Sequence, residues 1–471
     1  MSVSRSYIIS QYKVSKTTHD FVHAKLQGLD PEHRRFFLHI LCSQLLDLRK
    51  GTVEVVPGWD TLGINLPFVT IKAEFSRGFS WKPLEQRKLL TASDFAKGEC
   101  RYFQIDEPVF AEILSHIEAQ NASPDGSPAV NLFDGTAFNV GWSMSNAGAA
   151  RSSKLMRDAA RVLHAVDCPF DIDAVQEHLV QLKASGKLAA YENDRLCAQT
   201  LTAGSRREGG LGIYTPSYAP QSSGRIGELG GGLQSCSKAM KQAAFLRVDN
   251  IFNYDLRSSQ GYVLLQELQL AGIDSTWLVD HLGPGVFEQR AQALGLSKGS
   301  YKKCFFSTIM GATHWWIKEG HIGAVQDTVV KACTDASQAR AKFRAVVRQL
   351  APLKALVKLW TEWLLNDPAC PHRKKTQRRE FVENAAGQKL ILDRERDEKE
   401  LRREVAAHML QGQEAAYIHH LTLLAGDHGF IPVSNQHDGL VTVGAVPEAA
   451  RKEAAELSGF KHAFLDKKSF L

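Results

Sequence analysis

A polar pentapeptide near the C-terminus, flanked by two apolar runs, constrains the fold of this chain more than any other stretch. The pentapeptide is Asn-Gln-His-Asp-Gly at residues 435–439, and the flanking runs are residues 430–433 and 440–443. Asp-Gly between apolar runs is typical of a β-hairpin turn, because glycine adopts positive φ without steric cost. A carboxylate at a rigid hairpin tip is a suitable ligand for a divalent metal. The stretch alone fits an ordinary surface turn better, so a metal site requires a second acidic element.

Residues 245–257 provide that second acidic element. The even positions from 246 to 256 are mostly apolar, and the odd positions from 247 to 257 are mostly polar. This period of two predicts a β-strand with one buried face and one charged face. Asp255 ends the polar face. Asp249 shares the face but lies about 20 Å away at ~3.3 Å per residue, so these two carboxylates cannot bind the same metals.

Residues 296–312 have a helical pattern and carry four side chains at a spacing of four. These side chains are Lys298, Lys302, Phe306 and Met310, which fall along one slowly turning stripe of a helix. Two ammonium groups followed by an aromatic ring suit a nucleotide, with its phosphates on the lysines and its base against the ring. The spacing alone is explained more simply by a core helix with a solvated basic end.

The N-terminal region, residues 1–118, is expected to form one domain. Its pattern is a series of short helices followed by a β-hairpin with a basic tip, which resembles a winged helix. Such a module places a helix in the major groove, so this domain is a candidate for contact with duplex DNA. An unrelated small helical domain is the alternative. The expected helices are residues 33–48, 59–62, 69–76 and 81–90, and the expected strands are residues 52–56 and 100–105.

The middle of the chain, residues 119–220, is expected to combine a linker with helices. Residues 121–134 contain Ser-Pro-Asp-Gly-Ser-Pro, which is typical of a loop, and residues 155–166 and 172–188 have helical patterns. The Gly/Ser-rich residues 204–232 are not expected to pack as a core. We expect them to stay flexible or to wrap around a ligand.

Composition and charge narrow the class of protein. The chain has 471 residues, 44% hydrophobic and 23% charged, which is ordinary for a soluble protein of two or three domains. The net charge of +6 weakly favours an anionic partner such as nucleic acid, and the basic run at residues 372–379 is a candidate phosphate contact. The eight cysteines include no CxxC pair, which argues against a zinc ribbon or a redox motif. Without a membrane-length apolar run or a signal-peptide core, we expect a cytoplasmic protein with no membrane partner.

Five motifs in the second half of the chain, taken in order, resemble the polymerase core of family A DNA polymerases. Each motif alone is weak, but five in the family's own order are specific. The first motif is Ser-Gly-Arg-Ile at residues 223–226 with Leu-Gln at 233–234, which resembles TGRL…LQ, and the second is the strand ending in Asp255, which resembles motif A. The third is Lys298-x3-Lys302-x3-Phe306-x3-Met310-Gly311, which resembles the fingers pattern R-x3-K-x3-F/Y-x3-Y-G. The fourth is Met-Leu-Gln-Gly-Gln-Glu-Ala-Ala at residues 409–416, which resembles QGTAAD, and the fifth is Gln-His-Asp at residues 436–438, which resembles VHDE of motif C.

The resemblance implies an α+β fold of the right-hand polymerase type. Its features would be an antiparallel palm sheet, helical fingers inserted in the palm, and a mostly helical N-terminal region. The polymerase core would span residues 221–471, with the palm at residues 221–275 and 386–471 and the fingers at residues 276–385. Residues 119–220 would form a thumb-like region. The residues before the core leave little room for both a thumb and a proofreading exonuclease, so we expect no proofreading.

The resemblance also implies primer extension by nucleotidyl transfer, with two Mg²⁺ ions or Mn²⁺ in their place. Asp255 and Asp438 would bind both metals, and the backbone carbonyl of Leu256 would add a ligand. Lys302 would contact the triphosphate and donate a proton to the leaving group. The other expected contacts are Lys298, Phe306, Met310 and Gln260 for the nucleoside triphosphate, and Arg225, Gln234, Lys238, Lys241, Gln411 and His437 for the primer–template nucleic acid.

The departures from the family pattern leave two other functions open. Gly439 replaces the glutamate after the motif C aspartate, and Lys298 replaces an arginine, which loses the bidentate fork. Gln260 and Met310 stand where the family has the sugar-excluding glutamate and the helix tyrosine. An RNA polymerase or primase with the same palm is therefore one alternative. A DNA-binding replication initiator with a decayed polymerase core is the other, although both aspartates and both lysines are present.

Overall fold

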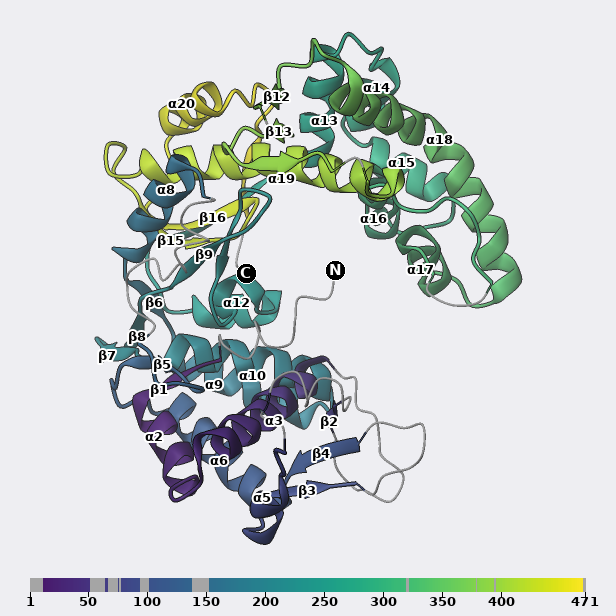
Figure 1. Ribbon diagram of the computed structural model, residues 1–471. Coiled ribbons are helices and arrows are strands. Elements are labelled where there is room, and N and C mark those ends of the chain that lie inside the picture. The colour runs from purple at the N-terminus through teal and green to yellow at the C-terminus, as the bar shows by residue number, and fades with distance from the viewer. Residues whose placement is uncertain are drawn as a thin grey trace.

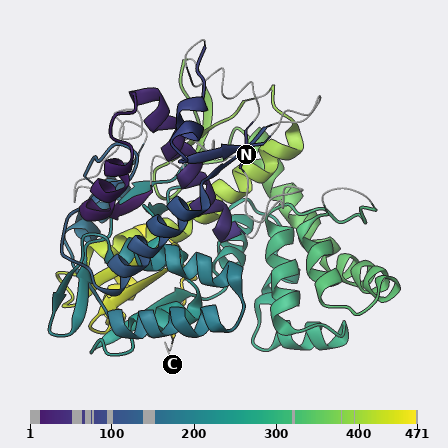
Figure 2. The same ribbon diagram turned by 90° about the horizontal axis from the view of Figure 1, so that it is seen from below.

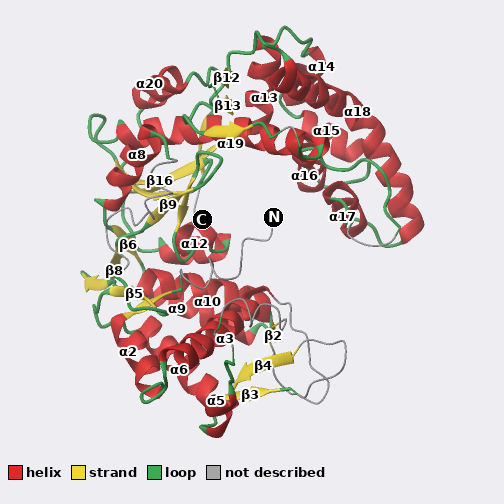
Figure 3. Cartoon of the chain, in the orientation of Figure 1, coloured by secondary structure: helices red, strands yellow, loops and turns green. Residues whose placement is uncertain are grey.

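The computed structural model describes residues 12–50, 64–66, 75, 78–93, 101–137, 152–318, 322–377, 379–393 and 395–468. These residues form a mixed α+β structure in which helices predominate (Figure 3) and every strand pair is antiparallel. The α+β class expected from the sequence is confirmed. Within the described ranges, no helix combines the length and the apolar character needed to cross a bilayer.

A four-stranded sheet with the order β15-β16-β11-β17 holds both acidic elements of the sequence (Figure 1). The strands are β11 (Ile251–Leu256), β15 (Ile431–Asn435), β16 (Gly439–Val443) and β17 (Leu465–Lys468). In the register, Asp255 lies opposite Gly439 on one side and opposite Asp466 on the other. The strand expected over residues 245–257 is therefore correct only for its second half. Its first half begins at Phe245, the C-cap of helix α12 (Lys238–Ala244), and includes the exposed Leu246.

Both faces of this sheet are covered, which explains why its strands are apolar on both sides. Tyr254 and Leu440 pack into the largest core of the molecule, with helices α19 (Glu398–Leu423) and α20 (Glu448–Ser458). Val433 and Val441 pack on the opposite face against a second core that includes α12. A sheet buried on both faces is rigid, and its hairpin tips are held in place by both layers.

A helical lobe of residues 259–366 is inserted between β11 and α19. Its helices are α13 (Ser259–Leu270), α14 (Thr276–Leu282), α15 (Val286–Ala293), α16 (Lys298–Ile309), α17 (Ala324–Lys331) and α18 (Ala336–Asn366). Figure 1 shows the lobe at the upper right, and Figure 2 shows it standing beside the sheet-containing part. The chain returns through a small sheet of β12 (Arg373–Lys375), β13 (Glu380–Glu383) and β14 (Lys389–Ile391) into α19, which crosses from the lobe to the sheet.

The N-terminal part has a core of its own. Its elements are β1 (Lys13–Ser15), α2 (Lys16–Lys25), α3 (Pro31–Lys50), β2 (Ile64–Leu66), α5 (Lys82–Gln86), β3 (Leu90–Ala92), β4 (Arg101–Ile105), α6 (Glu107–Ala122) and β5 (Ala129–Asn131). The long helix α3 is followed by a three-stranded sheet of order β2-β4-β3. The helix expected over residues 81–90 is shorter, because the chain enters β3 at Leu90. The elements expected at residues 52–56 and 59–62, and nearly all of 69–76, lie outside the described residues.

The middle of the chain alternates helices with short strands. Its elements are α8 (Lys154–His164), β6 (Cys168–Phe170), α9 (Ile172–Ala184), α10 (Leu188–Thr202), β7 (Arg206–Glu208), β8 (Leu211–Tyr214), β9 (Tyr218–Pro220), β10 (Ile226–Glu228) and α11 (Gly232–Ser235). Residues 204–232 were not expected to pack as a core, and were therefore expected to stay flexible or wrap around a ligand. This expectation is wrong, because the segment forms four strands. Tyr214 and Tyr218 within it are buried and anchor it to the core. Its glycines supply tight turns between those strands.

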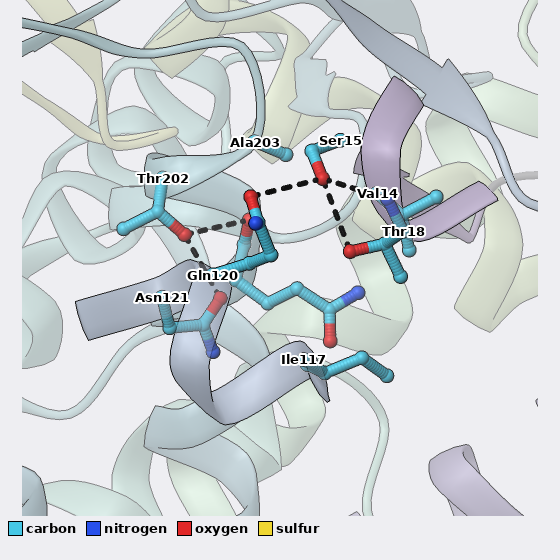
Figure 4. A pocket seen from close by; sticks show the side chains of 9 residues that line it. Val14, Ser15, Thr18, Ile117, Gln120, Asn121, Thr202 and Ala203 are labelled. Atoms are coloured by element: carbon cyan, nitrogen blue, oxygen red, sulfur yellow. Dashed lines mark hydrogen bonds between the residues drawn. The ribbon is translucent and has the colours of Figure 1, made fainter. Parts of the chain in front are cut away.

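A polar seam joins the N-terminal part to α10. The Tyr12 hydroxyl donates to Gln199 Oε1 over 3.1 Å, and the Gln199 amide donates to the Lys13 carbonyl over 2.8 Å. Figure 4 shows Thr202 and Asn121 turned toward each other across a cavity in this seam, and the Thr202 hydroxyl lies 2.9 Å from Asn121 Oδ1. The cavity, of about 10 Å³, is the size of one water molecule, so it is not a ligand site.

Candidate functional site

The structure brings Asp255 and Asp438 together where β11 ends and β16 begins, in the middle of the central sheet. Asp438 ends the hairpin loop before β16, and its backbone carbonyl accepts a hydrogen bond from the Leu256 amide over 2.8 Å. Partial burial raises the pKa of Asp255 to about 6, and the negative charge of Asp438 is the second cause of that rise. The Asp255 side chain remains 41% exposed. Two neighbouring carboxylates that open to solvent repel each other, and a bound cation relieves that repulsion.

Gly439 makes this close approach of the two strands possible. A Cβ atom added at Gly439 would lie 2.2 Å from the Tyr254 backbone carbonyl oxygen. The sequence argument placed the glycine in the turn for its positive φ, and that reason is wrong. The positive φ belongs to His437, at 69°, while Gly439 already pairs with Asp255 in the sheet. The missing motif C glutamate therefore has a steric explanation in this chain.

Two charged residues of β17, which the sequence analysis did not single out, border the aspartate pair. Lys468 Nζ lies 3.8 Å from an Asp255 oxygen and 3.8 Å from an Asp466 oxygen. Asp466 also accepts two hydrogen bonds from Arg257, over 2.7 and 2.8 Å. The Asp466 carboxylate is thus already neutralised by two cations, whereas Asp255 faces one lysine at the edge of contact distance. Asp466 lacked a sequence signal because its position depends on the pairing of β17 with β11.

Glu414 is a third carboxylate near the pair, and the sequence analysis missed it as well. It is fully buried on α19. Its oxygens accept hydrogen bonds from the Arg225 guanidinium and from the Ser259 hydroxyl at the start of α13. Burial raises the pKa of Glu414, the Arg225 charge opposes that rise, and the Asp438 charge adds to it. Glu414 therefore links α19, α13 and the segment of Arg225 directly behind Asp438.

The residues expected to contact nucleic acid lie around the hairpin, and two of them are tied to it. Gln234 does not present its amide to a groove, which corrects the expectation. Its Oε1 accepts from the Glu228 amide over 2.7 Å, and its Nε2 donates to the Ile226 and Asn435 carbonyls over 3.1 Å each. Gln234 therefore braces the strand β10 against the hairpin, because all its polar atoms are used internally.

The other expected nucleic-acid contacts differ in exposure. Lys238 is exposed on the first turn of α12, and Lys241, half-buried on the same helix, donates to Gln436. Gln411 is half-buried on α19. Burial lowers the pKa of His437 to about 4, helped by the positive charges of Arg225 and Lys241, so the ring is neutral at pH 7.

Helix α16 directs the lysine stripe toward the carboxylates. Ser297 caps the helix by accepting a hydrogen bond from the Ser300 amide, which sets where the stripe begins. The Lys302 charge lowers the pKa of Asp255 against the stronger effect of burial, so the two groups are near enough for their charges to interact. Lys302 Nζ also lies 5.5 Å from the centre of the Phe306 ring. Lys298, one turn earlier, is exposed and forms an ion pair with Glu288.

Three residues were expected to contact the base and sugar of the nucleotide. Phe306 lies in α16, Met310 ends that helix, and Gln260 lies at the start of α13. Phe306 is half-buried and packs edge-on against Phe305, with ring centres 5.3 Å apart. Met310 is the half-buried residue that ends α16, and Gln260 is half-buried in the first turn of α13. Sequence reasoning thus found the stripe correctly, because its period is a local property of one helix.

The described residues contain no group of three or more His, Cys, Asp and Glu side chains arranged to hold a metal. Two carboxylates alone make a poor site for zinc or calcium. Magnesium differs, because it is usually held by one or two carboxylates together with water and the phosphates of a substrate. The donor set at Asp255 and Asp438 therefore fits Mg²⁺ arriving with a phosphate-bearing substrate.

Comparison with known proteins gives distant likenesses among solved structures alone. No protein-family model and no curated protein matches this chain. Among solved structures, the chain is similar to the POL domain of Pol1 from M. smegmatis in complex with a DNA primer-template and dNTP. The TM-score is 0.36 and the sequence identity 12%, with 62% of this chain and 52% of that chain covered. This chain thus spans about half the length of the matched chain, and the proposed function rests on the site geometry.

Proposed function

We propose that this chain is a template-directed nucleotidyltransferase that extends a nucleic-acid primer, as a DNA polymerase without proofreading. The observation that carries the proposal is the pairing of Asp255 with Asp438 while Lys302 faces Asp255 from another part of the fold. Two adjacent carboxylates opposite an ammonium group suit a reaction in which polyanionic phosphates must be gathered and offset. The order of the five sequence motifs agrees with this chemistry.

Mg²⁺ fits the donor atoms of the site. Asp255 and Asp438 would hold two ions, with the backbone carbonyl of Leu256 as a further ligand. When bound, the metal ions lower the pKa of the primer 3′-hydroxyl and neutralise the triphosphate. Burial raises the pKa of Asp255 to about 6 and the Asp438 charge adds to that rise, so an added positive charge would stabilise the two carboxylates. Mn²⁺ has the same ligand preference and is expected to substitute.

The remaining chemistry belongs to side chains of α16 and α13. Lys302 would bind the triphosphate and give a proton to the pyrophosphate oxygen as the bond breaks, and Lys298 would bind the same phosphates after releasing Glu288. Phe306 would lie against the incoming base, with Met310 beside it and Gln260 near the sugar. Because α16 belongs to the inserted lobe, closure of the lobe would align these groups with the aspartates.

The nucleic acid would lie along the hairpin and α12. Arg225, held by Glu414, would contact the primer end together with the neutral ring of His437. Lys238 and Lys241 on α12 would bind backbone phosphates, and Gln411 would contact the template side from α19. Gln234 keeps the hairpin in register and makes no direct contact.

The test is primer extension by Asp255→Asn and Asp438→Asn variants. Each substitution keeps the shape of the side chain and removes one carboxylate charge, so we expect the rate of extension to fall at least about 100-fold. Asp249→Asn is the matched control, because Asp249 is an exposed carboxylate a few residues away. Folding is checked by the thermal unfolding curve. A rate within tenfold of the parent for either aspartate variant would contradict the assignment.

Ribonucleotide polymerisation is the second candidate. The observation that favours it is the identity of Gln260 and Met310, which are half-buried at the start of α13 and at the end of α16. Neither side chain carries the charge or ring with which family A polymerases exclude a 2′-hydroxyl. Incubation of the protein with a defined template and either dNTPs or NTPs, with and without a primer, separates polymerase, RNA polymerase and primase activity. Duplex binding without any synthesis would favour the initiator alternative.

A further inference from the structure

An exposed tryptophan flanked by two lysines lies on the loop that follows α16. Trp315 is 53% exposed. Lys399 Nζ lies 4.1 Å from the centre of its ring, and Lys354 Nζ lies 5.5 Å from it. A single exposed apolar side chain is ordinary, and it is the hollow and the two lysines beside this ring that point to a ligand. The ring borders a hollow of about 1020 Å³ between α16, α18 and the start of α19, and we call this the Trp315 hollow.

The side chains that line the Trp315 hollow include more cationic than acidic groups. Neither Lys354 nor Lys399 forms an ion pair within the part of the chain that the structure describes. Arg403 donates only to the Gly311 carbonyl, over 2.9 Å. Burial lowers the pKa of Lys354, and the positive charges of Lys399 and Arg403 lower it further, so the three cations repel one another.

The acidic side chains of the hollow already have partners. Glu362 and Glu398 both form ion pairs with Arg402, and Asp397 accepts a hydrogen bond from the Glu400 amide as the cap of α19. They do not neutralise the lysines beside Trp315. The hollow thus combines an exposed aromatic ring, over which Lys399 and Lys354 lie, with positive charge that no described acidic side chain balances. Aromatic rings and cations are combined in this way where single-stranded nucleic acid binds.

The hollow is connected to the aspartate pair by two helices. Along α16, nine residues separate Lys302 at the site from Gly311 at the hollow, and along α19 eleven residues separate Glu414 from Arg403. At ~1.5 Å per residue, each path is roughly 15 Å long. That length corresponds to about four nucleotides at ~3.4 Å each.

We propose that the Trp315 hollow binds the unpaired template strand about four nucleotides ahead of the site of synthesis. A base of that strand stacks on Trp315, and the phosphates on either side pair with Lys354 and Lys399. A duplex cannot bind in this way, because its bases face one another and leave no ring free to stack. The identity of the bound strand as the template rests on the proposed function, whereas the binding of single-stranded nucleic acid in the hollow does not.

The test measures the affinity for primer-templates that share one duplex and carry template overhangs of zero, two, four or eight nucleotides. Binding is followed by fluorescence anisotropy in EDTA, so that no synthesis occurs. For the parent protein, we expect affinity to rise up to four nucleotides or slightly more and then to level off. In the Trp315→Ala variant, the gain in affinity that the overhang provides should be roughly tenfold smaller. The Trp315→Phe variant should keep most of that gain.

A double variant, Lys354→Ala with Lys399→Ala, separates the phosphate contacts from stacking. We expect it to weaken overhang binding and to lower the slope of log affinity against log salt by about two. Leu359→Ala and Lys452→Ala are controls. Leu359 is an equally exposed apolar residue of α18 outside the hollow, and Lys452 is an exposed lysine on α20. Both controls should bind as the parent does.

Two results would overturn the proposal. In the first, the gain in affinity from the overhang is unchanged in both the Trp315→Ala and the double lysine variants. In the second, a free mononucleotide binds the hollow with the same affinity as the overhang, which would make the hollow a small-molecule pocket. Because binding is measured without metal, loss of the proposed activity would leave this result unaffected. A polymerase whose Trp315→Ala and double lysine variants both bind overhangs normally would refute the hollow and not the activity.

Discussion

Gly439 is the residue on which the geometry of the aspartate pair depends. It stands between Asp438 and the apolar part of β16, opposite Asp255, where the neighbouring strand leaves no room for a Cβ atom. A side chain here would push β16 away from β11 and lengthen the hydrogen bond from Leu256 to Asp438. Close backbone approach, and not turn formation, is thus the reason for a glycine.

We expect Gly439→Ala to lower the free energy of unfolding by about 3 kcal/mol, because the added methyl group cannot be accommodated without moving a strand. Urea denaturation measures this loss, and primer extension should fall with it. Gly426→Ala is the matched control. A Cβ at Gly426 meets no atom within 4 Å, so its effect should stay within about 0.5 kcal/mol. Equal stability of the two variants would show that the strands can separate freely.

At the scale of single elements, α19 carries more of the site than its sequence indicates. It extends from the Trp315 hollow past Glu414 to the sheet, and it buries polar side chains along the way. His419 is 1% exposed and donates from Nε2 to the Gly224 carbonyl over 2.9 Å, while its Nδ1 has no partner among the described residues. Glu414 and His419 thus hold the two sides of the segment containing Arg225.

The burial of His419 makes stability depend on pH. Burial lowers the pKa of His419 to about 4 in the folded protein, against about 6.5 in an unfolded chain. Between these values the unfolded chain binds a proton that the folded protein does not, so stability falls as the pH falls. From pH 7 to pH 5 this group should remove about 2 kcal/mol from the free energy of unfolding.

The variant His419→Gln tests this pH dependence, because the glutamine amide can still donate to Gly224 but cannot titrate. Urea denaturation at pH 7 and pH 5 gives the loss of stability for each protein. We expect the loss to be smaller in the variant by about 2 kcal/mol. Other buried histidines, such as His281, are unchanged and act equally in both proteins. Identical losses in the two proteins would contradict the buried neutral state of His419.

At the scale of the whole molecule, the N-terminal core and the largest core are separate clusters of buried residues. In the described residues, the buried members of the N-terminal core lie within residues 12–132, apart from Leu196 of α10. The largest core spans the sheet, α19 and the helical lobe. The N-terminal core adjoins α10 at the polar seam around Gln199, and Cys197, Ala198 and Leu201 of α10 belong to the core on the other face of the sheet from the largest one. Parts joined in this way tend to unfold separately.

We therefore expect two transitions in calorimetric unfolding. Phe36→Ala, in the centre of the N-terminal aromatic cluster, should destabilise one transition by about 3–5 kcal/mol and leave the other in place. Phe305→Ala, an equally buried phenylalanine of α16, should shift only the other transition. A single transition that both variants shift by the same amount would show that the two cores fold as one unit.

The sequence by itself determined the features that depend on neighbouring residues. The stripe of α16 was predictable because its period and its Ser297 cap are local, and Asp255 and Asp438 were found because each ends or precedes an apolar strand. These are properties of single helices and strands, whose backbone geometry and buried face follow from short-range sequence patterns. The α+β class follows from the same patterns.

Tertiary structure alone decided which distant side chains meet. Sheet register placed Asp466 and Lys468 beside Asp255, and the packing of α19 buried Glu414 behind Asp438. The internal use of Gln234 and the gathering of lysines around Trp315 also come from elements far apart in the chain. No local pattern encodes such meetings, because the position of one element relative to another follows from packing the whole core.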